Sequence, residues 1–224
     1  MSKAVSYRKT LITVSAVIIV GLIVMGIVGI YLQNAPPKNL YPSEVREYQS
    51  EDLSSISNVA NNAIAGTQHI NTSTYTLTVK GLVNKTLELS YDQVFNGFQI
   101  YQKVVTLHCI EGWSAKILWE GFLVKDLLQQ ASPDPNATTV IFYASDGYST
   151  ALPLEYLTKN DILIAYKMND IILPPERGFP FELVAESRYG YKWIKWITTI
   201  EVSNNTDYLG FWESRGYSNN AVVP

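Results

Sequence analysis

The sequence predicts an α+β domain that is richer in strand than in helix and is preceded by one transmembrane helix. The chain has 224 residues, of which 47% are hydrophobic and 17% are charged, so it can bury a core. From residue 75 onward, short runs rich in β-branched and aromatic residues are separated by glycines and turn residues, which is typical of strands. Before that point, residues 11–32 carry no charged side chain.

Residues 11–32 form the predicted membrane anchor. At about 1.5 Å per residue, a helix of this length spans about 33 Å, which exceeds a hydrocarbon core of about 30 Å. A cleaved signal peptide is the alternative, but its apolar part is usually about 7–15 residues long and ends at a small-residue cleavage site. The apolar stretch here is longer, and the sequence Gln33-Asn34-Ala35 that follows it is a poor match to such a site.

Positive charge before this segment predicts its orientation. Lys3, Arg8 and Lys9 precede the segment, and the first acidic residue of the chain is Glu44. By the positive-inside rule, residues 1–10 stay in the cytoplasm and the bulk of the chain lies outside. We therefore expect a single-pass protein of the cell membrane that is held in the lipid bilayer by this helix.

The outer part is expected to consist of a stalk and one domain. Residues 33–60 contain three prolines and many Ser and Asn residues, which is typical of a linker, although 44–56 is helix-like. Residues 61–224 are expected to form the extracytoplasmic domain. Four Asn-x-Ser/Thr triplets fit a glycosylated external surface, and they begin at Asn71, Asn84, Asn136 and Asn204.

Local patterns predict the elements of this domain. Ser90 is expected to cap a short helix that runs through Val94, because its hydroxyl can accept a free N–H of the first turn. Residues 123–130 place their leucines on one face of a second helix. Strands are expected at 75–80, 86–89, 101–109, 138–143, 148–152, 162–167, 181–184 and 191–202.

Composition excludes several classes of function. The formal net charge of −3 argues against a nucleic-acid partner, because such proteins present strongly basic surfaces. The single cysteine excludes an intrachain disulfide framework and any zinc or iron–sulfur site built from several cysteines. The chain also lacks a Gly-rich dinucleotide fingerprint, a P-loop and a haem attachment motif.

Cys109 is the candidate for site chemistry, because it follows a strand and precedes a Gly-containing loop. A free cysteine is often an inert, buried, small hydrophobic residue, and that interpretation stays open on composition alone. A soft thiolate also suits a transition metal. A catalytic Cys–His pair is disfavoured, because His108 points to the opposite face of a strand and His69 is distant in the sequence.

Cys109 lies in the first of several short motifs, His-Cys-Ile-Glu-Gly-Trp-Ser at 108–114. The others follow at 119–122 (Trp-Glu-Gly-Phe), 145–149 (Ser-Asp-Gly-Tyr-Ser), 152–154 (Leu-Pro-Leu), 163–169 (Leu-Ile-Ala-Tyr-Lys-Met-Asn), 178–180 (Gly-Phe-Pro), 189–196 (Tyr-Gly-Tyr-Lys-Trp-Ile-Lys-Trp) and 210–213 (Gly-Phe-Trp-Glu). In order and spacing these motifs resemble the molybdenum-cofactor domain of the sulfite oxidase superfamily. The Cys-x-Glu-x-Trp-Ser form is closer to the prokaryotic branch, which includes the periplasmic methionine-sulfoxide reductases. The resemblance covers about 75–217 and implies a sulfite-oxidase-type molybdopterin-binding fold.

The resemblance implies roles for individual residues. Cys109 matches the cysteine that ligates molybdenum, whose coordination is completed by one molybdopterin and by oxo or hydroxo groups. Tyr148 matches an active-site tyrosine that lies near the substrate oxygens. Gly190, Tyr191 and Lys192 match a segment that contacts the pterin and its phosphate, where a lysine suits an anion.

Other positions agree less well with the family pattern. Asn62 is a candidate for a pterin-binding asparagine. The family commonly has His or Asn before its Gly-x-Pro segment and Arg two residues beyond the proline, where this chain has Arg177 and Glu182. Because glutamate cannot replace an arginine that binds an anion, Arg177 or Arg188 is expected to supply the positive charge.

The predicted function is a membrane-anchored, extracytoplasmic molybdenum-cofactor oxidoreductase. It would transfer an oxygen atom to or from a small-molecule substrate of the sulfite, S-oxide or N-oxide type. Its electrons would pass to or from a membrane cytochrome or a quinone-linked subunit. The alternative is a cofactor-free accessory or binding subunit of a membrane respiratory complex that keeps the fold, in which Cys109 is merely buried.

Overall fold

The computed structural model describes Gly21, Met25 and residues 41–224. The chain divides into two compact units, Met1–Lys38 and Asn39–Pro224. Among the described residues, no helix is long and apolar enough to cross a membrane. The predicted anchor, residues 11–32, lies outside the described residues except for Gly21 and Met25.

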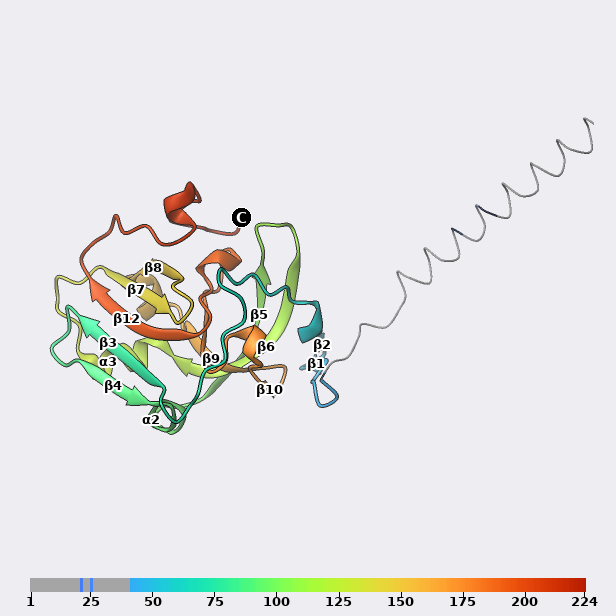
Figure 1. Ribbon diagram of the computed structural model, residues 1–224, viewed down its shortest axis with the longest axis horizontal. Coiled ribbons are helices and arrows are strands. Elements are labelled where there is room, and N and C mark those ends of the chain that lie inside the picture. Colours follow the sequence, from blue (N-terminus) through green and yellow to red (C-terminus); the bar gives the residue numbers. More distant parts are fainter. Residues whose placement is uncertain (1–20, 22–24, 26–40) are drawn as a thin grey trace, which may run out of the picture. The chain divides into compact units, whose positions relative to one another are not determined.

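The first of two five-stranded sheets carries the strand that leads to Cys109 (Figure 1). Four of its strands have the order β10-β9-β6-β5, β11 also pairs with β9, and every pair is antiparallel. These strands are β5 (Tyr101–His108), β6 (Ser114–Leu123), β9 (Leu163–Met168), β10 (Ile171–Ile172) and β11 (Glu182–Val184).

The second sheet has the order β4-β3-β12-β7-β8. Its central strand β12 runs parallel to β3 and antiparallel to β7, so the last strand of the domain is inserted between earlier ones. The strands are β3 (Thr76–Gly81), β4 (Leu87–Ser90), β7 (Thr139–Ala144), β8 (Ser149–Pro153) and β12 (Ile197–Ser203). Strands of both sheets contribute to one core, in which Leu77, Phe122, Phe142 and Phe181 are fully buried.

The two predicted helices are present. In α2 (Tyr91–Gly97), the Ser90 side chain accepts from the backbone N–H of Gln93, and the Gln93 side chain accepts from the Ser90 N–H, which completes a capping box. α3 (Val124–Ala131) buries Leu127 and Leu128, as its pattern predicts. A third helix, α4 (Leu154–Lys159), follows β8 and was not predicted.

Strand β6 was also missed, because glycine interrupts its apolar pattern. Gly121 lies at a register shift between β6 and β9, and a Cβ atom there would lie 2.1 Å from the carbonyl oxygen of Ile164. Only glycine allows this close approach of two backbones. The strand expected at 191–202 begins only at Ile197, because η3 (Gly190–Lys192) is a 3₁₀ turn and Trp196 has a φ of +53°.

The prediction of a stalk at residues 33–60 needs correction, because residues 41–60 pack onto the domain. The buried Glu44 carboxylate accepts hydrogen bonds from the Ile56 N–H (2.6 Å), the Ser55 hydroxyl (3.0 Å) and the Asn169 amide (2.8 Å). Leu53, like Ile56, is buried. Ser55, one of the polar residues that suggested a linker, therefore helps to satisfy a buried carboxylate, and the domain begins well before residue 61.

The helix-like segment 44–56 is likewise a wrong prediction. It forms a two-stranded hairpin of β1 (Glu47–Tyr48) and β2 (Glu51–Asp52), followed by the 3₁₀ turn η1 (Ile56–Asn58). Gln49 and Ser50 have φ values of 49° and 66°, which make the tight turn between the strands. Hairpin pairing thus outweighs a weak helical pattern here.

Candidate functional site

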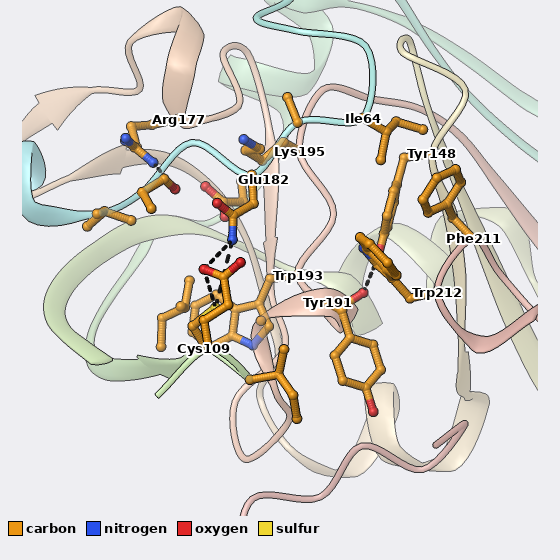
Figure 2. Close-up of a pocket in the computed structure, with 18 of the residues that line it drawn as sticks. Ile64, Cys109, Tyr148, Arg177, Glu182, Tyr191, Trp193, Lys195, Phe211 and Trp212 are labelled. Carbon is orange, nitrogen blue, oxygen red and sulfur yellow. Dashed lines mark hydrogen bonds between the residues drawn. The ribbon is translucent and has the colours of Figure 1, made fainter. Parts of the chain in front are cut away.

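The candidate site is a cavity of about 460 Å³ with a mostly apolar lining (Figure 2). This size is within the range of about 300–1,000 Å³ that is usual for small-molecule sites. The cavity is lined by segments that are far apart in the sequence: residues 59–64, the β5–β6 loop, the β7–β8 turn, the 3₁₀ turn η2 (Pro175–Arg177), η3 with the residues after it, and the C-terminal segment. Six of the predicted site residues line it: Asn62, Cys109, Tyr148, Arg177, Gly190 and Tyr191.

The β5–β6 hairpin loop presents Cys109 to this cavity. The Cys109 N–H donates to the carbonyl of Trp113 (2.9 Å), and the Gly112 N–H donates back to the carbonyl of Cys109 (3.1 Å). Gly112 has a φ of +92°, a conformation that favours glycine. The Cys-x-Glu-Gly-Trp pattern therefore folds into a tight loop that holds a half-buried thiol at the cavity wall.

Two polar side chains surround the thiol. The Asn62 amide donates to the Cys109 Sγ at 3.8 Å and to the Glu111 carboxylate at 3.4 Å. The Trp113 indole N–H also donates to Glu111, at 3.3 Å. Burial is the main cause that raises the pKa of Cys109, and the nearby Glu111 charge adds to it. A cation at the sulfur would have to displace the thiol proton.

Tyr148 forms another wall of the cavity. Its hydroxyl donates to the carbonyl of Tyr191 at 2.5 Å, and its ring lies 5.7 Å from that of Phe211. The turn before it is closed by Gly147 at φ +86° and by a hydrogen bond of 3.0 Å from the Tyr148 N–H to the Asp146 carboxylate. Burial, with the charges of Glu213 and Asp146, raises the pKa of Tyr148, so its hydroxyl stays protonated at neutral pH.

Positive charge is concentrated at Arg177 and Lys195, which both line the cavity. The Arg177 guanidinium donates to the carbonyl of Ala60 at 2.7 Å. The Lys195 ammonium donates to the Asn61 side chain and lies 4.3 Å from the centre of the Trp196 ring. The position of Lys195 was not foreseen from the sequence, although the Tyr-Gly-Tyr-Lys-Trp-Ile-Lys motif contains it.

The predicted contact of Lys192 with the pterin phosphate needs correction, because Lys192 does not line the cavity. Its side chain is 0% exposed and bonds to the Glu213 carboxylate, the carbonyl of Ala151 (3.0 Å) and the side chain of Asn219 (3.0 Å). Lys192 therefore pairs with an acidic residue of its own chain instead of facing a ligand. Arg188 also lies outside the cavity lining and donates to Asn220.

The C-terminal segment adds an aromatic wall that sequence patterns did not reveal. Phe211, Trp212 and Tyr217 line the cavity beside Tyr191. Their rings form a chain of contacts, with centroids 5.3 Å apart for Phe211 and Trp212, 5.2 Å for Trp212 and Tyr217, and 5.4 Å for Tyr217 and Tyr191. The segment 210–213 was identified only as a family motif, and no local pattern shows that it folds back over the cavity.

The residues present fit a molybdenum–pterin cofactor, with one exception. The Cys109 thiol is a soft ligand that suits a transition metal, and Arg177 and Lys195 supply positive charge for a phosphate. Aromatic rings can pack against a planar ring system. The exception is Glu182, a buried acidic side chain that lines the same cavity as the two cations.

Comparison with known proteins agrees with this chemistry. The model of the oxidoreductase molybdopterin binding domain family matches residues 64–212. The chain is 35% identical over 144 residues to the uncharacterized oxidoreductase YuiH of Bacillus subtilis (strain 168), which covers 64% of this chain and 72% of YuiH. It is 32% identical over 145 residues to the protein-methionine-sulfoxide reductase catalytic subunit MsrP of Gluconobacter oxydans (strain 621H), which covers 57% of this chain and 46% of MsrP.

A solved structure shows the same fold. The sulfane dehydrogenase SoxCD from Paracoccus pantotrophus superposes with a TM-score of 0.59 and 19% identity, over 62% of this chain and 41% of that chain. This chain thus spans less than half the length of MsrP and of the SoxCD chain. The superfamily predicted from the motifs around Cys109 is confirmed. The chain belongs to the oxidoreductase molybdopterin binding domain family, and it is an enzyme of the molybdopterin-dependent oxidoreductase type.

Proposed function

We propose that this protein is a membrane-anchored, extracytoplasmic oxidoreductase that uses molybdenum with one molybdopterin to move an oxygen atom to or from a small substrate. The observation that carries the proposal is the position of Cys109. The only cysteine of the chain lies on a tight loop at the wall of a ligand-sized cavity, on the same cavity as two cations. When bound, the cofactor supplies the two-electron oxygen-transfer chemistry.

Cys109 would be the protein's ligand to the metal. The Asn62 amide already points at the sulfur and at Glu111, so it can orient the thiolate and remain hydrogen-bonded when the thiol proton leaves. Arg177 and Lys195 would hold the phosphate end of the cofactor. Gly190 lies against the loop, where a Cβ added to it would make an ordinary van der Waals contact of 3.9 Å with the Cys109 Cα.

Tyr148 and the aromatic wall would position the substrate. The Tyr148 hydroxyl donates to the Tyr191 carbonyl in this structure, so it would turn its O–H toward the ligand to donate to an oxygen of the substrate, while its ring lines the cavity. Phe211 and Trp212 narrow the cavity on the same side and reduce the access of water. The likeness to MsrP favours an S-oxide among the sulfite, S-oxide and N-oxide candidates.

Anchoring and electron transfer complete the proposal. The uncharged segment 11–32 after three basic residues supports an anchor that leaves the domain outside the cytoplasm. Oxygen-atom transfer changes the oxidation state of the metal by two electrons, so the enzyme needs a partner. A cytochrome or quinone-linked subunit in the same membrane would be within reach of an anchored domain.

One observation favours the alternative of a cofactor-free accessory subunit. Glu182 lines the cavity beside the two cations, and in its ionised form it would offset part of their positive charge and weaken the binding of an anionic cofactor. Metal analysis separates the two functions. We expect near-stoichiometric molybdenum in the full-length protein purified from its native membrane, and its loss in Cys109→Ser. A folded wild-type protein without molybdenum would support the accessory role and contradict the proposed molybdenum centre at Cys109.

A further inference from the structure

Glu182 is a buried carboxyl group at the wall of the cavity. It lies on β11 and is 5% exposed. Within residues 41–224, the causes that act on its carboxyl group are burial and the charges of Lys195 and Arg177, and no side-chain hydrogen bond is among them. A buried carboxylate normally has several donors, so this one is free to interact with whatever occupies the cavity.

The two cations near Glu182 do not neutralise it by direct contact. Arg177 and Lys195 act on Glu182 through their charge alone. Arg177 donates to the carbonyl of Ala60, and Lys195 donates to the side chain of Asn61 and to the carbonyl of Glu176. Close packing at Gly178, where an added Cβ would lie 3.1 Å from the Cβ atoms of both Glu182 and Lys195, keeps these side chains side by side. The three groups thus face one part of the cavity without forming an ion pair.

Other charged groups in this region act on the cations. Glu176 and Asp146 act on Lys195, and Glu176 and Tyr41 act on Arg177. None of them contributes to the shift at Glu182. Ionisation of Glu182 therefore lowers the summed charge of Arg177, Lys195 and Glu182 from +2 to +1.

An anion that binds beside Arg177 and Lys195 meets this carboxyl group. A carboxylate would repel the anion, whereas a neutral carboxyl group has an O–H that can donate to an anionic oxygen. We propose that Glu182 carries a proton when an anionic oxygen group occupies this part of the cavity, and that it donates a hydrogen bond to that group. The identity of the anion as the phosphate of the cofactor rests on the proposed function.

The electrostatics of the site agree with this arrangement. Burial raises the pKa of Glu182 to about 8, against the opposing effect of Lys195 and Arg177. Burial also lowers the pKa of Lys195. Near neutral pH both groups are mainly protonated, so Arg177 and Lys195 carry two positive charges beside the O–H donor of Glu182. At higher pH both lose their protons, and anion binding must then take protons up from solvent.

Infrared difference spectroscopy on the full-length protein tests the proton directly. The probe is sulfate, which keeps its charge throughout the range and does not titrate itself. At about pH 9, roughly one unit above the pKa of Glu182, sulfate should produce the carbonyl stretch of a protonated carboxylic acid. Glu182→Gln should abolish this band. Glu186→Gln, which removes an acidic residue paired with Lys103 outside the cavity, should keep it.

The affinity for sulfate gives a second readout that is independent of the infrared band. In a Lys195→Arg background the cation cannot titrate, so the dissociation constant for sulfate should rise about tenfold per pH unit above the pKa of Glu182. In Lys195→Arg/Glu182→Gln it should stay constant over the same range. A wild type that binds no sulfate, or that binds it without the band and without this pH dependence, overturns the inference.

The two proposals can fail separately. If the native protein contains molybdenum but sulfate binding is the same with and without the Glu182 carboxyl group, the inference about Glu182 is wrong and the proposed function is unaffected. If the native protein contains no molybdenum but Glu182 takes up a proton when sulfate binds, the proposed cofactor is wrong and the inferred anion site is supported.

Discussion

The Lys192 ammonium and the Glu213 carboxylate form an ion pair in which both side chains are 0% exposed. Glu213 also accepts from the Thr150 hydroxyl at 2.6 Å, so strand β8, the turn η3 and the short 3₁₀ turn η4 (Glu213–Arg215) meet at one carboxylate. Neither residue lines the cavity, and the pair attaches the C-terminal segment that carries the aromatic wall to the sheet. Its role is thus to position the wall rather than to contact a ligand.

Breaking this pair from one side should destabilise the domain. Lys192→Met leaves Glu213 buried without its counter-charge, and we expect a loss of about 3–5 kcal/mol in the free energy of unfolding, measured with urea. The double variant Lys192→Met/Glu213→Leu removes both charges and should recover much of that loss. A double variant that is no more stable than the single one would contradict the assignment.

Gly121 should tolerate no side chain. In Gly121→Ala the added Cβ would lie 2.1 Å from the carbonyl oxygen of Ile164, so β6 and β9 must separate locally. We expect a loss of about 3 kcal/mol or more, seen as a lower midpoint in thermal unfolding. The matched control is Gly97→Ala in α2, where nothing lies within 4 Å. That change should be neutral, or stabilising by up to about 1 kcal/mol.

Tyr148→Phe should affect activity more than stability. The variant keeps the ring against Phe211 and loses only the hydrogen bond to the carbonyl of Tyr191, which costs about 1 kcal/mol of stability. If the hydroxyl orients substrate, kcat/KM with an S-oxide should fall by about tenfold or more. Unchanged steady-state kinetics in a molybdenum-loaded variant would show that Tyr148 serves only in packing.

Glu182 should make stability depend on pH in a defined direction. Its folded-state pKa is raised from 4.5 to about 8, so the unfolded chain loses this proton first as pH rises. The contribution of Glu182 to the free energy of unfolding is fully present below about pH 4.5 and is lost as the pH rises to about 8. Relative to wild type, Glu182→Gln should therefore gain stability over that interval, on the order of 4 kcal/mol, in urea titrations at several pH values. A constant difference between the two proteins would contradict the raised pKa.

Much of the fold was predictable wherever a local pattern coincided with the final environment. The capping box at Ser90, the buried face of α3 and most strands follow from residues close in sequence. The prediction failed at β6, where the reason for Gly121 is a strand more than 40 residues later, and at the segment 41–60. There, the buried partner Asn169 of Glu44 is 125 residues away.

The candidate site shows the same division. The sequence by itself determined that Cys109 sits at the end of a strand in a tight Gly-containing loop, and that the chain belongs to a molybdopterin-binding family. Only the tertiary structure decided which lysine of the motif faces the cavity. Glu213, 21 residues beyond Lys192, captures that lysine in the interior, so Lys195 lines the cavity beside Arg177 and Glu182. The physical reason is that a buried charge must find a counter-charge, and its partner comes from a distant part of the chain that only folding brings near.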